Sequence, residues 1–307
     1  MIIEASSVTK RFGDRLAVDS LSLKVRAGAC FGLLGPNGAG KTTTLRMIYG
    51  VTRPSSGTIQ VFGIDIVRNP RAVRSRLGVT LQQNVLIEAL SPEENLLVFG
   101  RYHLLREPDI SHRITDLLDF LDLRSHAQMP VRQLSGGLQR RLAIALSLMN
   151  EPELLILDEP TTGLDPAVRL SLWSRVRDLQ ARGTTVLLTT HYMDEAQRLC
   201  DRVAIVSGGK IIDEGNPLDL IVNHLAPEAI EFDCAPEEES SILNGLSLTC
   251  RPLRVGKRLM IYLNNATTLA DRIRRWDSGD RRVMVVRPTN LEDVFLTLTG
   301  THLESTP

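Results

Sequence analysis

GPNGAGKT, at residues 35–42, is the stretch that decides the fold of this chain. It matches the pattern GxxxxGK[ST], follows the apolar run CFGLL at 30–34 and precedes the helical run TTLRMIYG at 43–50. A strand, a glycine-rich loop and a helix in this order form a phosphate-binding loop, because the backbone N–H groups and the positive helix end face one phosphate. Lys41 then reaches the β- and γ-phosphates, and the Thr42 hydroxyl ligates Mg²⁺. All eight positions match, which disfavours an unliganded glycine-rich turn.

A second motif, LLILDEP at 154–160, is an apolar strand that ends in two carboxylates. Asp158 at the strand end can hold Mg²⁺ through water, and Glu159 is placed to polarise an attacking water. Taken alone, DEP after a strand could equally be a helix N-cap and its first turn. In a chain that also carries a phosphate-binding loop, the catalytic interpretation is favoured.

The third motif, LSGGLQRR at 134–141, places Ser135, Gly136 and Gly137 at the start of a helix. A hydroxyl and free backbone N–H groups converge at such a helix start and form a second phosphate-binding surface. One chain has one γ-phosphate site. We therefore expect the second surface to serve the nucleotide held by another copy of the chain.

Length and composition limit the classes of protein that this chain can be. The 307 residues fit about two domains, and 43% hydrophobic with 23% charged residues is typical of a globular protein. The 36 basic residues balance the 36 acidic ones, so no positive patch for nucleic acid is indicated. No apolar run reaches the length of about 20 residues that crosses a bilayer, and the first residues lack a secretion signal. The composition predicts a cytoplasmic protein, with its four cysteines as small core residues.

The pattern along residues 1–222 predicts an α/β domain, because short β-rich runs alternate with longer helical ones. Compact apolar runs, expected as buried parallel strands, lie at 30–34, 154–157, 185–189 and 202–206. Residues 1–28 and 57–63 alternate polar and apolar side chains and predict an antiparallel sheet, whereas residues 92–150 are mostly helical.

A break at HLAPEA, residues 224–229, predicts a second domain over 223–307. Its elements are expected in the order βαββαβ, the split βαβ of small ferredoxin-like α+β domains. The expected segments are a strand at 229–234, a helix at 237–245, strands at 247–252 and 258–263, a helix at 267–276 and a strand at 282–287. A last helix at 291–299 follows, with Asn290 as its N-cap.

Four motifs together carry a family resemblance: GPNGAGKTT, LSGG, LDEPTTGLD at 157–165 and TTH at 189–191. In this order they resemble the ATP-binding subunit of an ABC transporter, over nearly the whole chain. The resemblance implies a P-loop NTPase cassette with a mixed-sheet core, an antiparallel β subdomain and a helical subdomain. It also implies that Mg²⁺ and ATP are sandwiched between two cassettes.

Site residues follow from the resemblance position by position. Phe12 matches the aromatic residue that stacks on adenine, and Gln82 matches the glutamine that senses Mg²⁺ and γ-phosphate. Asp165 lies at the position of the loop that links the two sites, and His191 matches the switch histidine. The phosphate-binding positions are Gly35, Pro36, Asn37, Gly38, Ala39, Gly40, Lys41, Thr42 and Thr43. Thr42, Gln82 and Asp158 would serve Mg²⁺, and Glu159, His191 and Lys41 the reaction.

Some of these positions have alternatives or depart from the family pattern. Phe12 could be a core residue and His191 an ordinary surface histidine. No proline precedes the glutamine in LGVTLQQN, and Gln83 could take the place of Gln82. In LSGGLQ, the residue after the glycines is Leu138, so the glutamine comes one position later than in the common family form.

Three further phrases are similar to those of a narrower group: ENLLVFGRYH at 94–103, THYMDEAQRLCDRV at 190–203 and RPTNLEDVFLTLTG at 287–300. They resemble the ATPases that drive drug and antibiotic exporters and the nodulation-factor (lipo-chitooligosaccharide) exporter. The resemblance implies efflux of a drug, lipid or lipo-oligosaccharide through a separate integral-membrane permease, from the cytoplasmic side of the inner membrane. A soluble family member in translation or repair, or an importer subunit, is the alternative. The single phosphate-binding loop and the lack of a long coiled coil disfavour the soluble members.

Overall fold

The computed structural model describes residues 1–245, 252–276 and 283–300 and divides the chain into two compact units, Met1–Glu214 and Gly215–Pro307. The sequence placed the boundary after residue 222. It falls earlier because helix α8, Pro217–His224, packs against helix α11, Leu291–Thr299, within the second unit. Among the described residues, no helix combines the length and the apolar character that crossing a membrane requires.

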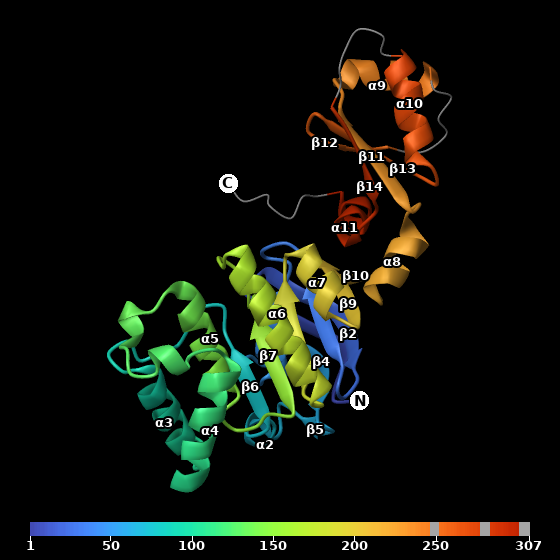
Figure 1. Cartoon of the computed structure of the whole chain (residues 1–307). Coiled ribbons are helices and arrows are strands. Elements are labelled where there is room, and N and C mark those ends of the chain that lie inside the picture. The colour runs from blue at the N-terminus through green and yellow to red at the C-terminus, as the bar shows by residue number, and fades with distance from the viewer. Residues whose placement is uncertain (246–251, 277–282, 301–307) are drawn as a thin grey trace. The chain divides into compact units, whose positions relative to one another are not determined.

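A six-stranded sheet is the centre of the first unit (Figure 1). Its order is β10 (Lys210–Gly215), β9 (Arg202–Ser207), β3 (Cys30–Leu34), β8 (Thr185–Thr190), β7 (Leu154–Asp158) and β6 (Leu77–Thr80). The five strands β9, β3, β8, β7 and β6 are parallel to one another. Every residue of β3, β7 and β8 is buried, as expected of strands covered on both faces. The four predicted parallel strands are confirmed, and their predicted residues are buried except Arg202, the exposed first residue of β9.

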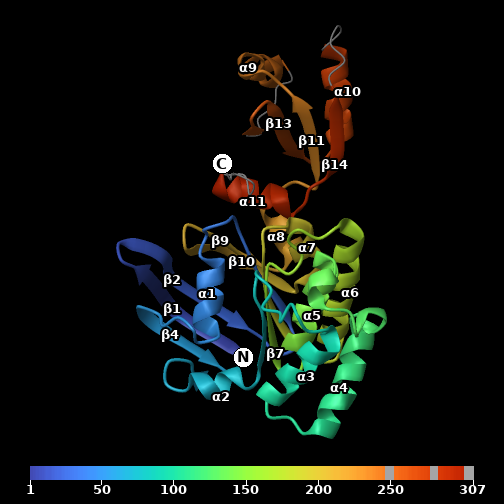
Figure 2. The same ribbon diagram turned by 90° about the vertical axis from the view of Figure 1, so that its left-hand side faces the viewer.

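A second, antiparallel sheet has the order β2 (Arg15–Val25), β1 (Ile3–Phe12), β4 (Ser56–Val61) and β5 (Ile64–Asp65). Its inward side chains share one hydrophobic core with helix α1, Lys41–Ile48, and with residues of the central sheet. Figure 2 shows α1 beside this antiparallel sheet. Because α1 is held in that core, the loop that precedes it has a fixed position. The short helix α2, Pro70–Arg74, follows β5.

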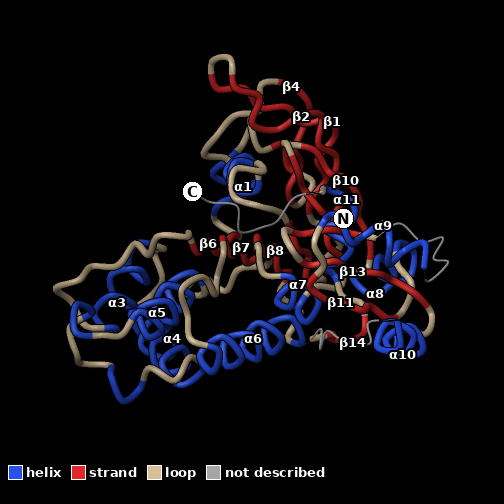
Figure 3. Tube along the Cα trace, turned by 90° about the horizontal axis from the view of Figure 1, so that it is seen from above, coloured by secondary structure: helices blue, strands red, loops and turns tan. Residues whose placement is uncertain are grey.

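The helical part of the first unit consists of α3 (Pro92–Tyr102), α4 (Glu107–Phe120) and α5 (Gly136–Ser147), with short 3₁₀ turns at Arg124–His126 and Val131–Gln133. Figure 3 shows α3, α4 and α5 gathered at one end of the unit. Helix α3 begins with a capping box between Ser91 and Glu94. Two more helices, α6 (Pro166–Ala181) and α7 (Met193–Leu199), connect the strands of the central sheet.

The second unit has the predicted βαββαβ arrangement. Its antiparallel sheet has the order β12 (Leu253–Val255), β13 (Arg258–Leu263), β11 (Glu228–Asp233) and β14 (Met284–Pro288), and α9 (Pro236–Gly245) and α10 (Ala266–Trp276) complete the pattern. The predicted second strand, 247–252, differs from the structure. Residues 247–251 lie outside the described part of the chain, and the observed strand β12 follows them.

Helix α11 is fixed at its first turn by a buried carboxylate. Asn290 is the N-cap, as predicted, and forms a capping box with Asp293. Asp293 is 1% exposed, accepts hydrogen bonds from both terminal nitrogens of Arg287 at 2.6 and 2.8 Å, and accepts another from the Tyr262 hydroxyl at 3.1 Å. These contacts anchor α11 to strands β13 and β14 of its own unit. Its residues Leu291 and Phe295 are fully buried.

Candidate functional site

The loop between β3 and α1 can be built only with glycine at two of its positions. A Cβ atom on Gly35 would lie 2.1 Å from the backbone oxygen of Val206. Gly40 has φ +103°, and its Cβ would lie 2.5 Å from the backbone oxygen of Ala17. A side chain at either position would displace neighbouring backbone, so the tight curve of the loop requires glycine there. The curve turns the loop around a cradle of the kind that holds phosphate groups.

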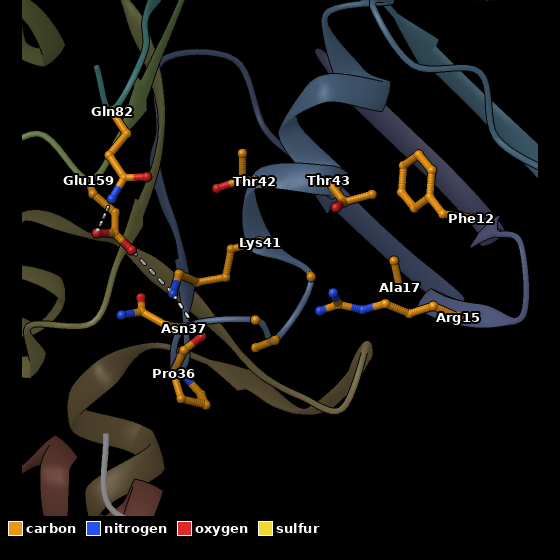
Figure 4. Close-up of a pocket in the computed structure, with 13 residues that line it drawn as sticks. Phe12, Arg15, Ala17, Pro36, Asn37, Lys41, Thr42, Thr43, Gln82 and Glu159 are labelled. Carbon is orange, nitrogen blue, oxygen red and sulfur yellow. Dashed lines mark hydrogen bonds and ion pairs between the residues drawn. The ribbon is translucent and has the colours of Figure 1, made fainter. Parts of the chain in front are cut away.

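This loop forms one wall of a pocket of about 530 Å³, a size typical of small-molecule sites (Figure 4). Eleven of the lining residues belong to the predicted site: Phe12, Pro36, Asn37, Gly38, Ala39, Gly40, Lys41, Thr42, Thr43, Gln82 and Glu159. Phe12 and Arg15 lie at one end of the pocket, and Gln82 and Glu159 at the other. Gln83, the alternative to Gln82, is not among the lining residues.

Phe12 lies on the pocket wall and not in the core, since it is 50% exposed. It ends β1 and pairs with Arg15 at the turn into β2. The Lys10 ammonium group lies 4.8 Å from the centre of the Phe12 ring. An exposed ring at the end of a pocket opposite a phosphate cradle offers a face on which a planar base can stack.

Lys41 is a buried cation at the inner end of the pocket. It is 4% exposed, and its Nζ donates hydrogen bonds to the backbone oxygens of Gly35 at 2.6 Å and Pro36 at 3.1 Å. The same atom lies 3.4 Å from Glu159 Oε1. Burial lowers the pKa of Lys41, and the charge of Glu159 opposes that effect. The loop therefore presents a positive charge whose carboxylate partner comes from a different strand.

Glu159 has an unusual backbone conformation, with φ +46°. This left-handed region is costly for a residue with a side chain, by about 1–3 kcal/mol. Two hydrogen bonds hold its backbone N–H in place, one to Thr189 Oγ1 at 3.0 Å and one to the Thr189 backbone oxygen at 3.1 Å. The turn directs the side chain out of β7 and into the pocket.

The Glu159 carboxylate contacts polar groups from its own loop and from two other segments. Oε2 accepts hydrogen bonds from Thr162 Oγ1 at 3.2 Å and Gln82 Nε2 at 3.4 Å, and His191 Nδ1 lies 3.3 Å from the same oxygen. Burial raises the pKa of Glu159, but His191 and the charge of Lys41 outweigh burial and lower the pKa to about 2. Glu159 is therefore ionised at neutral pH and can accept a proton or orient a water molecule.

Asp158 and Thr42 place two oxygen ligands side by side. Asp158 is 3% exposed, and its Oδ1 accepts hydrogen bonds from Thr189 Oγ1 at 2.6 Å and Thr42 Oγ1 at 3.2 Å. Carboxylate and hydroxyl oxygens are the donors that Mg²⁺ prefers. Among the described residues, no cluster of three His, Cys, Asp or Glu side chains could hold a metal by itself. A Mg²⁺ ion fits here if phosphate and water complete its shell, as is usual at nucleotide sites.

The other predicted phosphate surface lies outside this pocket. Ser135 is the N-cap of α5 and accepts a hydrogen bond from the Leu138 backbone N–H at 3.4 Å. Gly136 and Gly137 form the first turn, and a Cβ on Gly136 would meet nothing within 4 Å. Asp165, at the N-cap of α6, is exposed and makes no capping bond. None of these four residues lines the pocket with Lys41.

Two residues that support the site were missed by sequence reasoning. Thr189 bridges the Asp158 carboxylate and the Glu159 backbone, as described above. Arg140 is 5% exposed and donates hydrogen bonds to the backbone oxygens of Asp158, Glu159 and Pro160. The signal for Arg140 was a basic residue on a helix that is otherwise apolar from 142 to 146, and the signal for Thr189 was the threonine pair before His191. Neither signal identifies the hydrogen-bond partners that Arg140 and Thr189 have in the folded chain.

Comparison with protein families gives two matches along the chain. Residues 18–162 match the family model described as ABC transporter. Residues 241–300 match the model described as the C-terminal domain of the nodulation factor export protein NodI.

Individual proteins resemble the chain over almost its full length. A Nod factor export ATP-binding protein I from Sinorhizobium fredii is 46% identical over 303 residues, covering 98% of this chain and 87% of that protein. A protein of the same description from Burkholderia lata is 44% identical and covers 98% of each chain.

Solved structures resemble about 70% of the chain. An ATP-binding subunit of an ABC transporter matches with a TM-score of 0.66 and 29% identity, covering 72% of this chain and 92% of that one. The dimeric, post-hydrolysis structure of an ATP-binding cassette with ADP and phosphate matches with a TM-score of 0.64 and 26% identity, covering 70% and 98%.

We expect Thr189→Val to slow ATP hydrolysis by about 10- to 100-fold, because it leaves the Asp158 carboxylate and the Glu159 N–H each without one partner. Thr185→Val is the matched control: Thr185 is equally buried at the other end of β8, where it accepts a hydrogen bond from the Gly28 N–H. Steady-state phosphate release distinguishes the two variants. Equal rates for Thr189→Val and Thr185→Val would show that the Thr189 hydroxyl has no part in the reaction.

Proposed function

This chain belongs to the ABC transporter family as an ATP-binding, ATP-hydrolysing subunit, and from that premise we propose that it drives export of a lipo-oligosaccharide of the Nod factor class. The likeness to Nod factor export ATP-binding proteins carries the proposal, since it extends over 98% of the chain at 46% identity. It includes the second unit, which matches the NodI C-terminal model. No observation favours the alternatives of translation, repair or import.

We assign ATP to the pocket with its base on Phe12 and its phosphates in the loop. The Phe12 ring is exposed at the end of the pocket that lies away from Glu159. Loop N–H groups and Lys41 at the other end supply positive charge for the phosphates. When the γ-phosphate enters, Lys41 gains a second anionic partner. The charge of Lys41 then no longer depends on Glu159 for its neutralisation.

Hydrolysis then requires an ionised carboxylate beside the terminal phosphate. Glu159 would orient the attacking water and accept its proton, while His191 and Gln82 hold the carboxylate at 3.3 and 3.4 Å. Bound Mg²⁺, held by Thr42 and Asp158 with Gln82 nearby, would neutralise charge on the phosphates. Water adds to the γ-phosphorus, the bond to the β-phosphate oxygen breaks, and ADP and phosphate leave.

We propose that a second copy completes the site. Ser135, Gly136 and Gly137 form a helix start with open backbone N–H groups, and none of them reaches the pocket of its own chain. A helix N-terminus attracts anions, so these residues fit the γ-phosphate of ATP held by the partner copy. Asp165, at the N-cap of α6, is exposed and would lie at the same interface.

A membrane subunit is the third proposed component. The likeness to export ATP-binding proteins supports this component, since the cargo of an exporter crosses a membrane. An apolar cavity of about 310 Å³ is lined by residues of β6 and α3, and two of its lining residues, Val85 and Tyr102, are 67 and 80% exposed. Large exposed apolar side chains around a groove are typical of a docking surface for a partner helix. Docking there would place the chain on the cytoplasmic face of the inner membrane.

Replacing the proposed base tests the reaction. Glu159→Gln should retain ATP binding and slow hydrolysis by about 10²- to 10⁴-fold, because the amide keeps the shape but accepts no proton. Glu153→Gln is the control, since Glu153 is an exposed carboxylate at the opposite end of the same strand, paired with Arg76. Normal turnover by Glu159→Gln would contradict the assignment.

The proposed pairing of copies predicts ATP-dependent dimers. The Glu159→Gln chain should sediment as a dimer with ATP and as a monomer without it. Adding Gly136→Asp should abolish the dimer, because the carboxylate faces the partner's phosphates, while the free chain tolerates it in open space at a helix N-terminus. Ser111→Asp, which adds the same charge at an exposed site on α4, should leave the dimer intact. A Gly136→Asp dimer as stable as its parent would contradict the sandwich.

Export can be measured in cells that synthesise lipo-chitooligosaccharide but lack their own exporter. Cells given this chain with its cognate membrane subunit should release the lipo-chitooligosaccharide into the medium, detected by mass spectrometry, whereas the Glu159→Gln chain should release none. Efflux of a hydrophobic cationic dye serves as the comparison for a drug exporter. Dye efflux without release of the oligosaccharide would reassign the cargo.

A further inference from the structure

Arg140 is a buried cation whose hydrogen bonds go to four backbone oxygens and one side-chain amide oxygen, and to no carboxylate. Its Nε donates to the Pro160 oxygen at 2.8 Å, and Nη2 donates to the oxygens of Asp158 at 2.8 Å and Glu159 at 3.1 Å. Its Nη1 donates to the Leu81 oxygen and to Asn84 Oδ1. The five hydrogen bonds equal the number of N–H donors on a guanidinium group. Every donor of this buried group is therefore used.

The acceptors of Arg140 lie on the two segments that carry Glu159 and Gln82. Three successive oxygens, at residues 158–160, belong to the turn in which Glu159 has φ +46°. Leu81 directly precedes Gln82, and Asn84 follows it by two residues. The side chains of Gln82 and Glu159 meet at 3.4 Å on the pocket wall. The planar guanidinium group of Arg140 thus fixes the distance between the two backbone segments that carry Gln82 and Glu159.

The third segment joined by Arg140 is its own helix. Arg140 lies one turn beyond Gly136 in α5, the helix that begins with Ser135. The neighbouring Arg141 points elsewhere: it donates to the Leu121 oxygen, Asp122 and Ser171, none of which belongs to the pocket. The two adjacent arginines therefore bind different parts of the unit. Arg140 binds the segments that carry Glu159 and Gln82, and Arg141 binds the end of α4 and helix α6.

We propose that Arg140 is a positioning residue for ATP hydrolysis, which holds the Glu159 turn and the Gln82 loop in register with each other and with the helix that begins at Ser135. Lysine cannot replace it, because a single ammonium group has three donors and no planar fork to span two backbone segments. This inference rests on the proposed function, in which Glu159 acts on water at the terminal phosphate.

The first test separates binding from turnover in the full chain. Arg140→Lys keeps the charge and should lower kcat for ATP hydrolysis by about 10- to 100-fold, the effect of losing one or two charge-assisted hydrogen bonds. The affinity for ATP, measured with a fluorescent ATP analogue, should change by less than about threefold, because no atom of Arg140 lines the pocket. Arg141→Lys is the matched control and should leave kcat unchanged. Equal kcat for the two variants would overturn the proposal.

A double-mutant cycle with Glu159→Gln tests whether Arg140 acts through Glu159. Once the carboxylate is absent, its position no longer matters, so Arg140→Lys should lower the residual single-turnover rate by less than about threefold. If the two effects multiply, Arg140 does not act through Glu159 and the inference is wrong. If Glu159→Gln itself hydrolyses ATP at the normal rate, the proposed function fails instead.

If Arg140→Lys fails to fold, Asn84→Ala tests the same positioning role. Asn84 is exposed, so its side chain can be removed without opening a cavity, and only its hydrogen bond with Arg140 Nη1 at 3.1 Å is lost. We expect kcat to fall by about 2- to 10-fold in the parent chain, as for one such hydrogen bond, and to remain unchanged in the Glu159→Gln background. Unchanged kcat in the parent chain, or an equal loss in both, would contradict the positioning role.

Discussion

The contact between Lys41 and Glu159, at 3.4 Å, is the interaction on which the site depends. Both side chains are buried, and a buried charge without a partner is costly. Each therefore stabilises the other until phosphate enters. In the proposed mechanism, a γ-phosphate would provide Lys41 with a stronger anionic partner, and Glu159 would become available to a water molecule. We propose that the pair keeps the pocket preformed and links ATP binding to the activity of Glu159 as the base.

The central sheet brings these two residues together. Lys41 follows β3, Glu159 follows β7, and β8 lies between these two parallel strands. Ligands bind at the carboxyl ends of parallel strands because loops from several strands converge there. Thr189, near the end of β8, fixes the end of β7, because its hydroxyl accepts a hydrogen bond from the Glu159 N–H and donates one to Asp158. The helical part adds Arg140, so the proposed base, the proposed metal ligand Asp158 and the helix that begins at Ser135 are joined by one set of hydrogen bonds.

Much of the fold and the site could be predicted because the signals are local. The loop at 35–42 has its own glycine requirements, the apolar runs of the central strands are continuous, and Asn290 caps α11 through neighbouring residues. Features that depend on distant partners could not be predicted. The choice between Gln82 and Gln83 depends on how the loop after β6 meets β7, and the bonds of Arg140 depend on two segments remote in sequence. The assignment of α8 to the second unit depends on its packing against α11, which follows about 70 residues later.

A crystal structure of the chain with Mg²⁺ and a non-hydrolysable ATP analogue tests the central claim most directly. We expect Lys41 Nζ to leave the backbone oxygens of Gly35 and Pro36 and to bind the β- and γ-phosphate oxygens. Glu159 should then face a water molecule beside the γ-phosphate, with the helix start at Ser135 of a second copy on the opposite side. A structure in which Lys41 keeps its contact with Glu159 while the phosphates bind elsewhere would contradict this account.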